Sequence, residues 1–327
     1  MSRRDREVCA LSCAEALAEE LDLPAGGVLV AGGDPEPLVA ELADQGRPAE
    51  VWQRHGFDGA DAAPWPAEGP FAAATLRLPK GKDALRMWAA ELARRLVDGG
   101  VLYVHGANDE GIKSAGKVLK TWFDDVEAVV SRRHTRVWRA ASRHTKPEAT
   151  QPTTVSATVK GVELSWQSYP GLFAHGHLDP ATQALLEHLP AIDGRTLDYG
   201  CGAGVISQFV QRRDGIAPDG VDVDALALEA FRVNVPEAEA YLCDRLPPDT
   251  GRYRFILSNP PLHRGKEATP GPIRALIDAA PRRLGRSGEL WIATQGAMAL
   301  RGHLQERFKV VEQVWRDRRF AVWRATR

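Results

Sequence analysis

The chain has 327 residues, of which 44% are hydrophobic and 26% are charged, and its formal net charge is -1. This composition excludes a mainly disordered chain, and the length is sufficient for two domains. No apolar run approaches the roughly 18 residues of a membrane helix, and the charged start of the chain is unlike a signal peptide, so we expect a cytoplasmic protein. Four cysteines without a C-x-x-C pair indicate neither a disulfide framework nor a metal site.

Basic side chains cluster locally despite the low net charge. The carboxyl-terminal stretch VWRDRRFAVWRATR is strongly basic. Such runs are usually solvated surface, but they also allow a face that binds nucleic acid. Charge alone leaves both interpretations open.

The two halves of the chain repeat each other. The tetrapeptide VWRA occurs at residues 137–140 and again at 322–325, and ARRLVDGGVLYVHG (93–106) aligns with PRRLGRSGELWIAT (281–294). The offsets are similar, 322 minus 137 or 185 and 282 minus 94 or 188, which favours duplication over chance. We therefore predict two tandem α/β domains, residues 1–145 and residues 146–327.

A linker and a hairpin are expected where the second half begins. Residues 142–158 are rich in Thr, Ser, Pro and charge, which is typical of a linker. Two alternating runs then flank Lys160 and Gly161 and predict a β-hairpin.

The stretch LDYGCGAG, residues 197–204, is typical of a ligand-binding turn between a strand and a helix. Gly200, Gly202 and Gly204 alternate before an apolar helix that we expect to begin near Val205. Glycines let a ligand approach the backbone and allow positive φ, and the free N–H groups of a helix start point at that ligand.

Acidic residues accompany three predicted strands. Asp198, before the first glycine, disfavours a pyrophosphate at the turn, so a cationic or zwitterionic cofactor fits better. A strand over residues 220–223 presents Asp222, our first choice for accepting both ribose hydroxyls, while Asp224 is alternatively a helix N-cap. A third strand is expected to end at Asp244, either beside an adenine amino group or as an exposed loop aspartate.

The stretch RFILSNPPLH, residues 254–263, predicts a buried strand that ends in a displayed amide. Pro260 and Pro261 cannot donate to a sheet ladder, so the strand must stop near Asn259. Ligands of an open α/β sheet bind beyond the carboxyl ends of its strands. By itself the motif is more typical of a plain strand terminus with a proline-stiffened turn.

In this order, LDYGCGAG, GVDVD, CDRL and SNPPLH resemble the motifs of class I S-adenosylmethionine-dependent methyltransferases. The closest resemblance is to the RsmC/RlmG group of bacterial ribosomal RNA guanine-N2 methyltransferases. It extends over YPGLFAHGHLD (169–179) and RRFAVWRA in the second half, and over LPKGKDALRMWAAELARRL and GANDEGIKSAGKVL in the first. It implies two Rossmann-like methyltransferase folds in tandem, the first without cofactor, and methylation of a guanine N2 in ribosomal RNA, 16S RNA being favoured.

The residues of the first half do not match the cofactor motifs of the second half. Val30 occupies the position of Asp198, and Arg77 or Leu78 the position where an amide is needed. We therefore expect the first domain to be noncatalytic and the cofactor to bind through Asp198, Gly200, Gly202, Gly204, Asp222 and Asp244.

The Asn-Pro-Pro motif of this family holds planar amines. The Asn259 oxygen and the Pro260 carbonyl can accept both hydrogens of a guanine amine and free its lone pair toward the methyl group. Leu262 replaces the aromatic residue that usually stacks on the base. The remaining candidates around the base are Phe173, Pro261, Leu262 and His263, the last also a candidate catalytic residue.

Two other functions remain open at this stage. Asn-Pro-Pro also holds adenine N6 amines and the side-chain amide of protein glutamine. A noncatalytic RNA-binding assembly factor is the third reading, disfavoured because Asp198 and Asn259 occur together. The expected partner is ribosomal RNA or a ribosomal subunit, and the duplicated pair within one chain suits a monomer.

Overall fold

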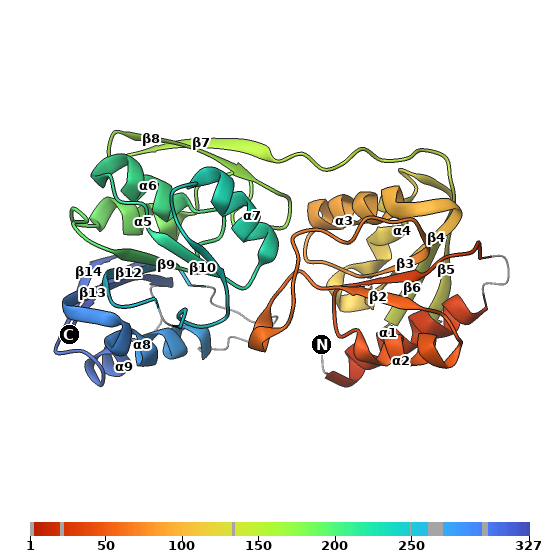
Figure 1. Ribbon diagram of the computed structural model, residues 1–327, viewed down its shortest axis with the longest axis horizontal. Coiled ribbons are helices and arrows are strands. Elements are labelled where there is room, and N and C mark those ends of the chain that lie inside the picture. The colour runs from red at the N-terminus through yellow and green to blue at the C-terminus, as the bar shows by residue number, and fades with distance from the viewer. Residues whose placement is uncertain (1–2, 20–22, 133–134, 249, 261–270, 296–299) are drawn as a thin grey trace. The chain divides into compact units, whose positions relative to one another are not determined.

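The structure is a computed structural model, which describes residues 3–19, 23–132, 135–248, 250–260, 271–295 and 300–327 (Figure 1). These residues form two compact units. The first comprises Met1–Arg54 and Trp65–Gln151, and the second comprises His55–Pro64 and Pro152–Arg327. No helix of the described residues is long and apolar enough to cross a membrane.

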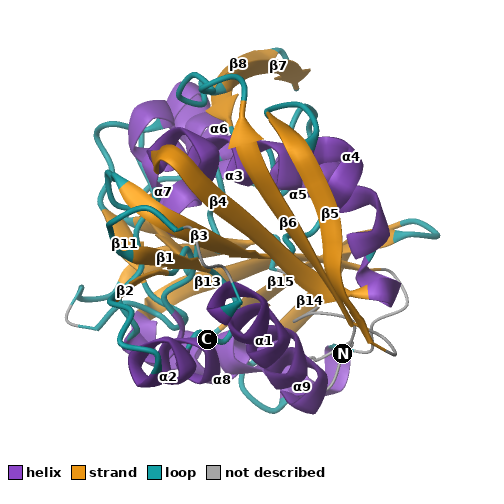
Figure 2. Ribbon diagram, turned by 90° about the vertical axis from the view of Figure 1, so that its right-hand side faces the viewer, coloured by secondary structure: helices purple, strands orange, loops and turns teal. Residues whose placement is uncertain are grey.

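The first unit is built on a six-stranded sheet of order β2-β1-β3-β4-β6-β5. Its strands are parallel from β2 to β4, and β6 runs antiparallel to both β4 and β5. Figure 2 shows α1 and α2 on one face of this sheet and α3 and α4 on the other. The elements are α1 (Arg3–Ala18), β1 (Val28–Ala31), α2 (Glu36–Asp44), β2 (Ala49–Trp52), β3 (Phe71–Arg77), α3 (Lys82–Arg95), β4 (Leu96–Ala107), η2 (Asn108–Glu110), η3 (Ile112–Ser114), α4 (Ala115–Leu119), β5 (Phe123–Arg132) and β6 (Thr135–Arg143).

The second unit is built on a seven-stranded sheet of order β11-β10-β9-β12-β13-β15-β14 and a separate two-stranded hairpin. Helices α5, α6 and α7 cover one face of the sheet, and α8 and α9 cover the other (Figure 1). The elements are η1 (Phe57–Gly59), β7 (Thr153–Val159), β8 (Val162–Ser168), α5 (Pro180–His188), β9 (Thr196–Tyr199), α6 (Val205–Asp214), β10 (Asp219–Asp222), α7 (Ala225–Asn234), β11 (Ala240–Leu242), β12 (Tyr253–Ser258), α8 (Gly271–Arg283), β13 (Leu284–Gln295), α9 (Arg301–Gln305), β14 (Val310–Arg316) and β15 (Phe320–Thr326).

The duplication seen in the sequence is a duplication of topology. The strand order of the first sheet is that of the second without the outermost strand β11. The cross-strand register also recurs, because Tyr103 lies opposite Arg139 and Trp291 lies opposite Arg324 in the two equivalent antiparallel pairs. The predicted fold class, two tandem Rossmann-like α/β units, is confirmed.

The core of the second unit follows from its apolar pattern. Strand β12 contributes side chains that are buried on both faces of the sheet, as expected of a central parallel strand. Helix α8 contributes Ile273, Leu276, Ile277 and Ala280, a spacing that forms one apolar face of a helix. Three tryptophans are also buried in this unit, namely Trp166, Trp291 and Trp323.

The predicted hairpin is formed by β7 and β8. Lys160 and Gly161 form its two-residue turn with φ angles of 48° and 78°, both positive as such turns require. Side chains of α6 and α7 hold β8, because Gln208 Oε1 and Asn234 Oδ1 accept backbone N–H groups of that strand. The hairpin is therefore attached to α6 and α7, the helices that follow β9 and β10.

Candidate active site

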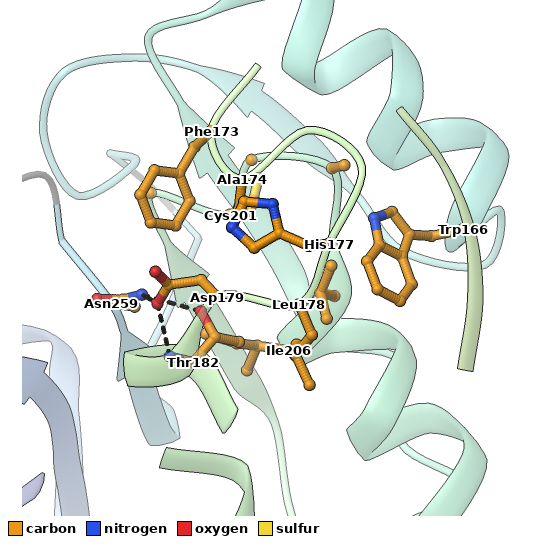
Figure 3. Close-up of a pocket in the computed structure, with 14 residues that line it drawn as sticks. Trp166, Phe173, Ala174, His177, Leu178, Asp179, Thr182, Cys201, Ile206 and Asn259 are labelled. Atoms are coloured by element: carbon orange, nitrogen blue, oxygen red, sulfur yellow. Dashed lines mark hydrogen bonds between the residues drawn. The ribbon is translucent and has the colours of Figure 1, made fainter. Parts of the chain in front are cut away.

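A pocket opens at the carboxyl ends of β9 and β12, the edge at which ligands of such sheets bind (Figure 3). Strand β9 lies between β10 and β12, where the strand order reverses. The glycine loop, defined here as residues 200–204, contributes one wall, and residues 173–182 with Asn259 contribute the other. The pocket encloses about 460 Å³ of space, a volume that includes open solvent.

Glycine is required at the three motif positions for different physical reasons. All have positive φ, and α6 begins at Val205 as predicted. A Cβ atom on Gly202 would meet no atom within 4 Å, so this face of the loop is open to a ligand. A Cβ atom on Gly204 would lie 2.8 Å from Cδ2 of Phe231, so this glycine serves packing. Gly200 and Gly202 line the pocket of Figure 3, and Gly204 does not.

Asp198 lies inside the protein and does not line the pocket. Its side chain is fully buried, and its Oδ2 accepts a hydrogen bond of 2.8 Å from Ser207 Oγ. Its Oδ1 has no hydrogen-bond partner among the described residues. Burial raises the pKa of this carboxyl to about 7. A positive charge at the glycine loop would favour its ionised form.

Asp222 ties the end of β10 to the glycine loop. Its Oδ2 accepts from the Gly202 N–H at 2.9 Å and its Oδ1 from the Asp224 N–H at 3.0 Å, and its side chain does not line the pocket of Figure 3. Burial, with a smaller contribution from the Asp224 charge, raises the pKa of Asp222 to about 6. Asp224 is the N-cap of α7, accepting from the N–H groups of Leu226 and Ala227.

Strand β11 is shorter than expected. It was predicted to reach Asp244, but its pairing with β10 ends at Leu242, opposite Asp222, the last residue of that strand. The Asp244 side chain is mostly covered and its Oδ1 lies 3.2 Å from Arg245 Nε, while its backbone carbonyl accepts from the Tyr199 hydroxyl. Asp244 does not line the pocket of Figure 3.

A segment from the first half of the chain, His55–Pro64, borders the same strand ends of the second unit. The Gly56 N–H donates to the Val223 carbonyl at 2.8 Å, and His55 Nε2 lies 4.0 Å from Asp224 Oδ2. Sequence reasoning missed this segment because no local pattern distinguishes it from an ordinary loop.

Asn259 stands where the sequence placed it, directly after the last residue of β12. Its Nδ2 donates to Asp179 Oδ2 and to Thr182 Oγ1, both at 2.9 Å (Figure 3). Asp179 is the N-cap of α5, and the same Oδ2 accepts the Thr182 N–H. Sequence reasoning missed both partners, although an Asp-Pro pair is a usual helix start.

The other predicted residues divide between the pocket and the part of the chain that is not described. Phe173 lines the pocket with a side chain that is 65% exposed, and Pro260 is buried. Pro261, Leu262 and His263 lie outside the described residues. Within the described ranges, no three His, Cys, Asp or Glu side chains are grouped as metal ligands.

The equivalent place in the first unit is filled by a side chain. The register of β1 with β3 matches that of β9 with β12 when Val30 is set against Asp198, and it places Arg77 at the position of Asn259. A Cβ atom on Gly33 would lie 2.9 Å from Arg77 Cγ, and the Arg77 guanidinium pairs with Glu110.

Two family models and several relatives match the chain. The Methyltransferase small domain matches residues 163–324, and the Methyltransferase small domain N-terminal matches residues 22–156. Ribosomal RNA small subunit methyltransferase C of Pseudomonas fluorescens (strain Pf-5) is 31% identical over 343 residues, covering 96% of this chain and 98% of the relative. The protein of that name from Pseudomonas putida (strain W619) is 32% identical over 302 residues, covering 84% and 87%.

A solved structure of similar fold covers nearly the whole chain. The T. thermophilus 16S rRNA N2 G1207 methyltransferase (RsmC), in complex with AdoMet and guanosine, superposes with a TM-score of 0.80 at 21% identity. The match covers 96% of this chain and 91% of that chain. At 21% sequence identity, this structural similarity establishes the fold alone.

Proposed function

The chain belongs to the family of ribosomal RNA small subunit methyltransferase C proteins, and on this premise we propose that it methylates ribosomal RNA in the cytoplasm. The reaction is transfer of a methyl group from S-adenosylmethionine to the exocyclic N2 amine of a guanine, with 16S RNA as the favoured substrate. The single observation that carries this proposal is Asn259, whose side-chain nitrogen is bound by α5, so that its oxygen faces away from that helix.

The second unit fits a cationic cofactor. The glycine loop is open at Gly202, whose N–H donates to Asp222. The buried Asp198 carboxyl has one oxygen that lacks a partner among the described side chains. When bound, S-adenosylmethionine supplies an electrophilic methyl group on a positively charged sulfur. We assign its binding to the backbone of Gly200 and Gly202, to the charge of Asp198, and to Asp222 for the ribose hydroxyls.

Two further residues complete the assignment. Gly204 supports the loop by letting α6 start against Phe231. Asp244 follows β11, and we place it near the adenine amino group, as the family pattern implies.

The chain's contribution to the chemistry is to hold the target amine. The lone pair of a guanine amine is delocalised into the ring, so the amine is a poor nucleophile. The Asn259 oxygen and the Pro260 carbonyl accept its two hydrogens and favour a geometry that releases the lone pair. Alignment of the amine with the methyl group then lowers the barrier without a covalent intermediate on the protein.

The base itself needs an apolar surface, which we assign to Phe173. Its ring lines the pocket and is mostly exposed, so a base that enters can cover it. A stacked base is worth about 1–3 kcal/mol, which offsets part of the cost of flipping a nucleotide out of a helix. Pro261, Leu262 and His263 follow Asn259 and Pro260 in sequence and are assigned to the surroundings of the base by the family pattern.

The first unit is proposed to be noncatalytic. Arg77 occupies the space over Gly33 that a cofactor would need, and Val30 supplies no carboxylate. We infer that this unit supports the second and contributes contacts to RNA.

The test is methyl transfer from labelled S-adenosylmethionine to ribosomal RNA, both free and in subunits, followed by nucleoside analysis. Label in N2-methylguanosine is the expected result. Label in N6-methyladenosine or in protein glutamine would move the assignment to another planar amine. Cofactor binding without transfer to any of these would favour the noncatalytic assembly factor.

A further inference from the structure

Asn259 is held by a carboxylate that belongs to another element. Asp179 and Thr182 lie at the start of α5, and both accept hydrogen bonds of 2.9 Å from the Asn259 amide nitrogen. Asp179 and Asn259 are separated by 80 positions in the chain. The contact therefore joins the first turn of α5 to the carboxyl end of β12, on the wall of the pocket where both residues lie (Figure 3).

The chemistry of the partners fixes which way the amide points. An ionised carboxylate accepts hydrogen bonds and donates none, so only the nitrogen of Asn259 can face Asp179. A rotation of the amide by 180° would place its oxygen against the carboxylate, which is repulsive and loses the hydrogen bond to Asp179. The Asn259 oxygen is consequently held on the side away from α5.

Helix capping does not explain this arrangement. The cap of α5 needs one side-chain oxygen for the Thr182 N–H, and Ser, Thr or Asn provides that oxygen as well as Asp does. The hydrogen bond to Asn259 is additional, and its acceptor carries a full charge. Charged acceptors form hydrogen bonds about twice as strong as neutral ones, and an amide that donates to one carries more negative charge on its oxygen.

We propose that Asp179 is a positioning residue for methyl transfer, acting through Asn259. It orients the amide so that the oxygen, and not the nitrogen, meets the target amine, and its charge makes that oxygen a stronger acceptor. The Thr182 hydroxyl accepts the second hydrogen bond of the same amide nitrogen. This inference rests on the proposed function, because it concerns how the same amide receives a planar amine.

The decisive variant is Asp179→Asn. Asparagine caps helices as well as aspartate, so α5 is retained. The oxygen that caps Thr182 is also the one that accepts from Asn259, so in the variant Asn259 faces a neutral amide oxygen and the charge is lost. We expect the single-turnover rate constant at saturating cofactor and RNA to fall at least about tenfold, the loss expected when a charge-assisted hydrogen bond is removed. The dissociation constant of the cofactor, the KM for RNA and the melting temperature should stay close to those of the wild type.

Two further variants sharpen the comparison. Thr182→Val removes the second acceptor and leaves the charge, so it should slow transfer less than Asp179→Asn does. Asp317→Asn is the matched control, because Asp317 also accepts backbone N–H groups, in the turn between β14 and β15, and does not line the pocket. Its rate constant should equal that of the wild type.

A second readout does not depend on activity. The side-chain NH₂ resonances of Asn259, identified by their loss in Asn259→Ala, should shift in Asp179→Asn because the charged acceptor is gone. If these resonances do not move, the positioning role is overturned whether or not RNA is methylated. If they move but the wild type methylates no RNA, the orientation of the amide stands and the proposed function fails.

Two other outcomes would overturn the role of Asp179. An unchanged rate constant in Asp179→Asn, with an active wild type, would remove Asp179 from the reaction and leave the proposed function intact. A lower rate constant together with weaker cofactor binding and a lower melting temperature would show that the contact only maintains the structure. A selective loss of rate, with the resonance shift, is the result that the geometry predicts.

Discussion

Arg77 covers Gly33: its Cγ would lie 2.9 Å from a Cβ atom on that glycine. In the second unit, a Cβ atom on Gly202 meets no atom within 4 Å. The two units share a strand order, yet one glycine loop is filled by a side chain of its own unit and the other is open. The difference between the units is therefore local, at the ends of two equivalent strands.

Because Arg77 fills the glycine loop of the first unit, we predict that each chain binds one cofactor. Isothermal titration with S-adenosylmethionine should give a stoichiometry of one. The variant Arg77→Ala removes the covering side chain but supplies no carboxylate at Val30, so its stoichiometry should also be one. A second binding event in either protein would contradict the proposal that the first unit is noncatalytic.

The glycine loop predicts stability losses of different size for two nearby alanine substitutions. Gly204→Ala places a Cβ atom 2.8 Å from the Phe231 ring at a φ of 85°, so overpacking and strain should lower the free energy of unfolding by about 2–5 kcal/mol. Gly202→Ala meets no neighbouring atom, so only the backbone strain of about 1–2 kcal/mol is expected.

The same pair should differ in cofactor binding. The methyl group of Gly202→Ala stands on the open face of the loop, where it blocks close approach, so the dissociation constant should rise at least about tenfold. Chemical denaturation and equilibrium binding measure the two quantities. A Gly202→Ala protein that binds cofactor as the wild type does would mean that this face is not the cofactor site.

The buried carboxyl of Asp198 predicts a specific dependence of stability on pH. Its pKa is raised from 3.8 to about 7, so folding favours the protonated form. The stability gained from that form is complete below pH 4, declines as the pH rises and is lost above pH 7. At 1.36 kcal/mol per pKa unit, the upper limit of the change is on the order of 4 kcal/mol.

The variant Asp198→Asn isolates this contribution. It stays uncharged at every pH and can still accept from Ser207. The free energy of unfolding of the wild type minus that of the variant should fall between pH 4 and pH 7 and then level off, as measured by denaturation without cofactor. A difference that does not vary with pH would show that Asp198 keeps an ordinary pKa in the folded protein.

Much of the site could be predicted because its determinants are local. Pro260 and Pro261 stop β12 at Asn259, and glycine conformations set the start of α6. The burial of Asp198 was not predicted, because a motif position does not reveal whether a side chain faces the ligand or the core. The structure places this carboxyl behind the loop, against Ser207.

Contacts between distant segments could not be predicted. The bonds from Asn259 to Asp179 and Thr182 depend on how α5 packs beside β12, which no local pattern encodes. The segment His55–Pro64 belongs with the second unit although it lies in the first half of the sequence. Strand β11 ends at Leu242 because its partner strand β10 ends opposite that residue.

The central claim is that Asn259 receives the target amine, and single-turnover methyl transfer by Asn259→Ala tests it most directly. The substitution removes one acceptor at the reacting group, so the rate constant for N2-methylguanosine formation should fall about 10²- to 10³-fold. The dissociation constant of S-adenosylmethionine, measured in parallel, should not change. A variant that transfers methyl groups at the rate of the wild type would contradict the account.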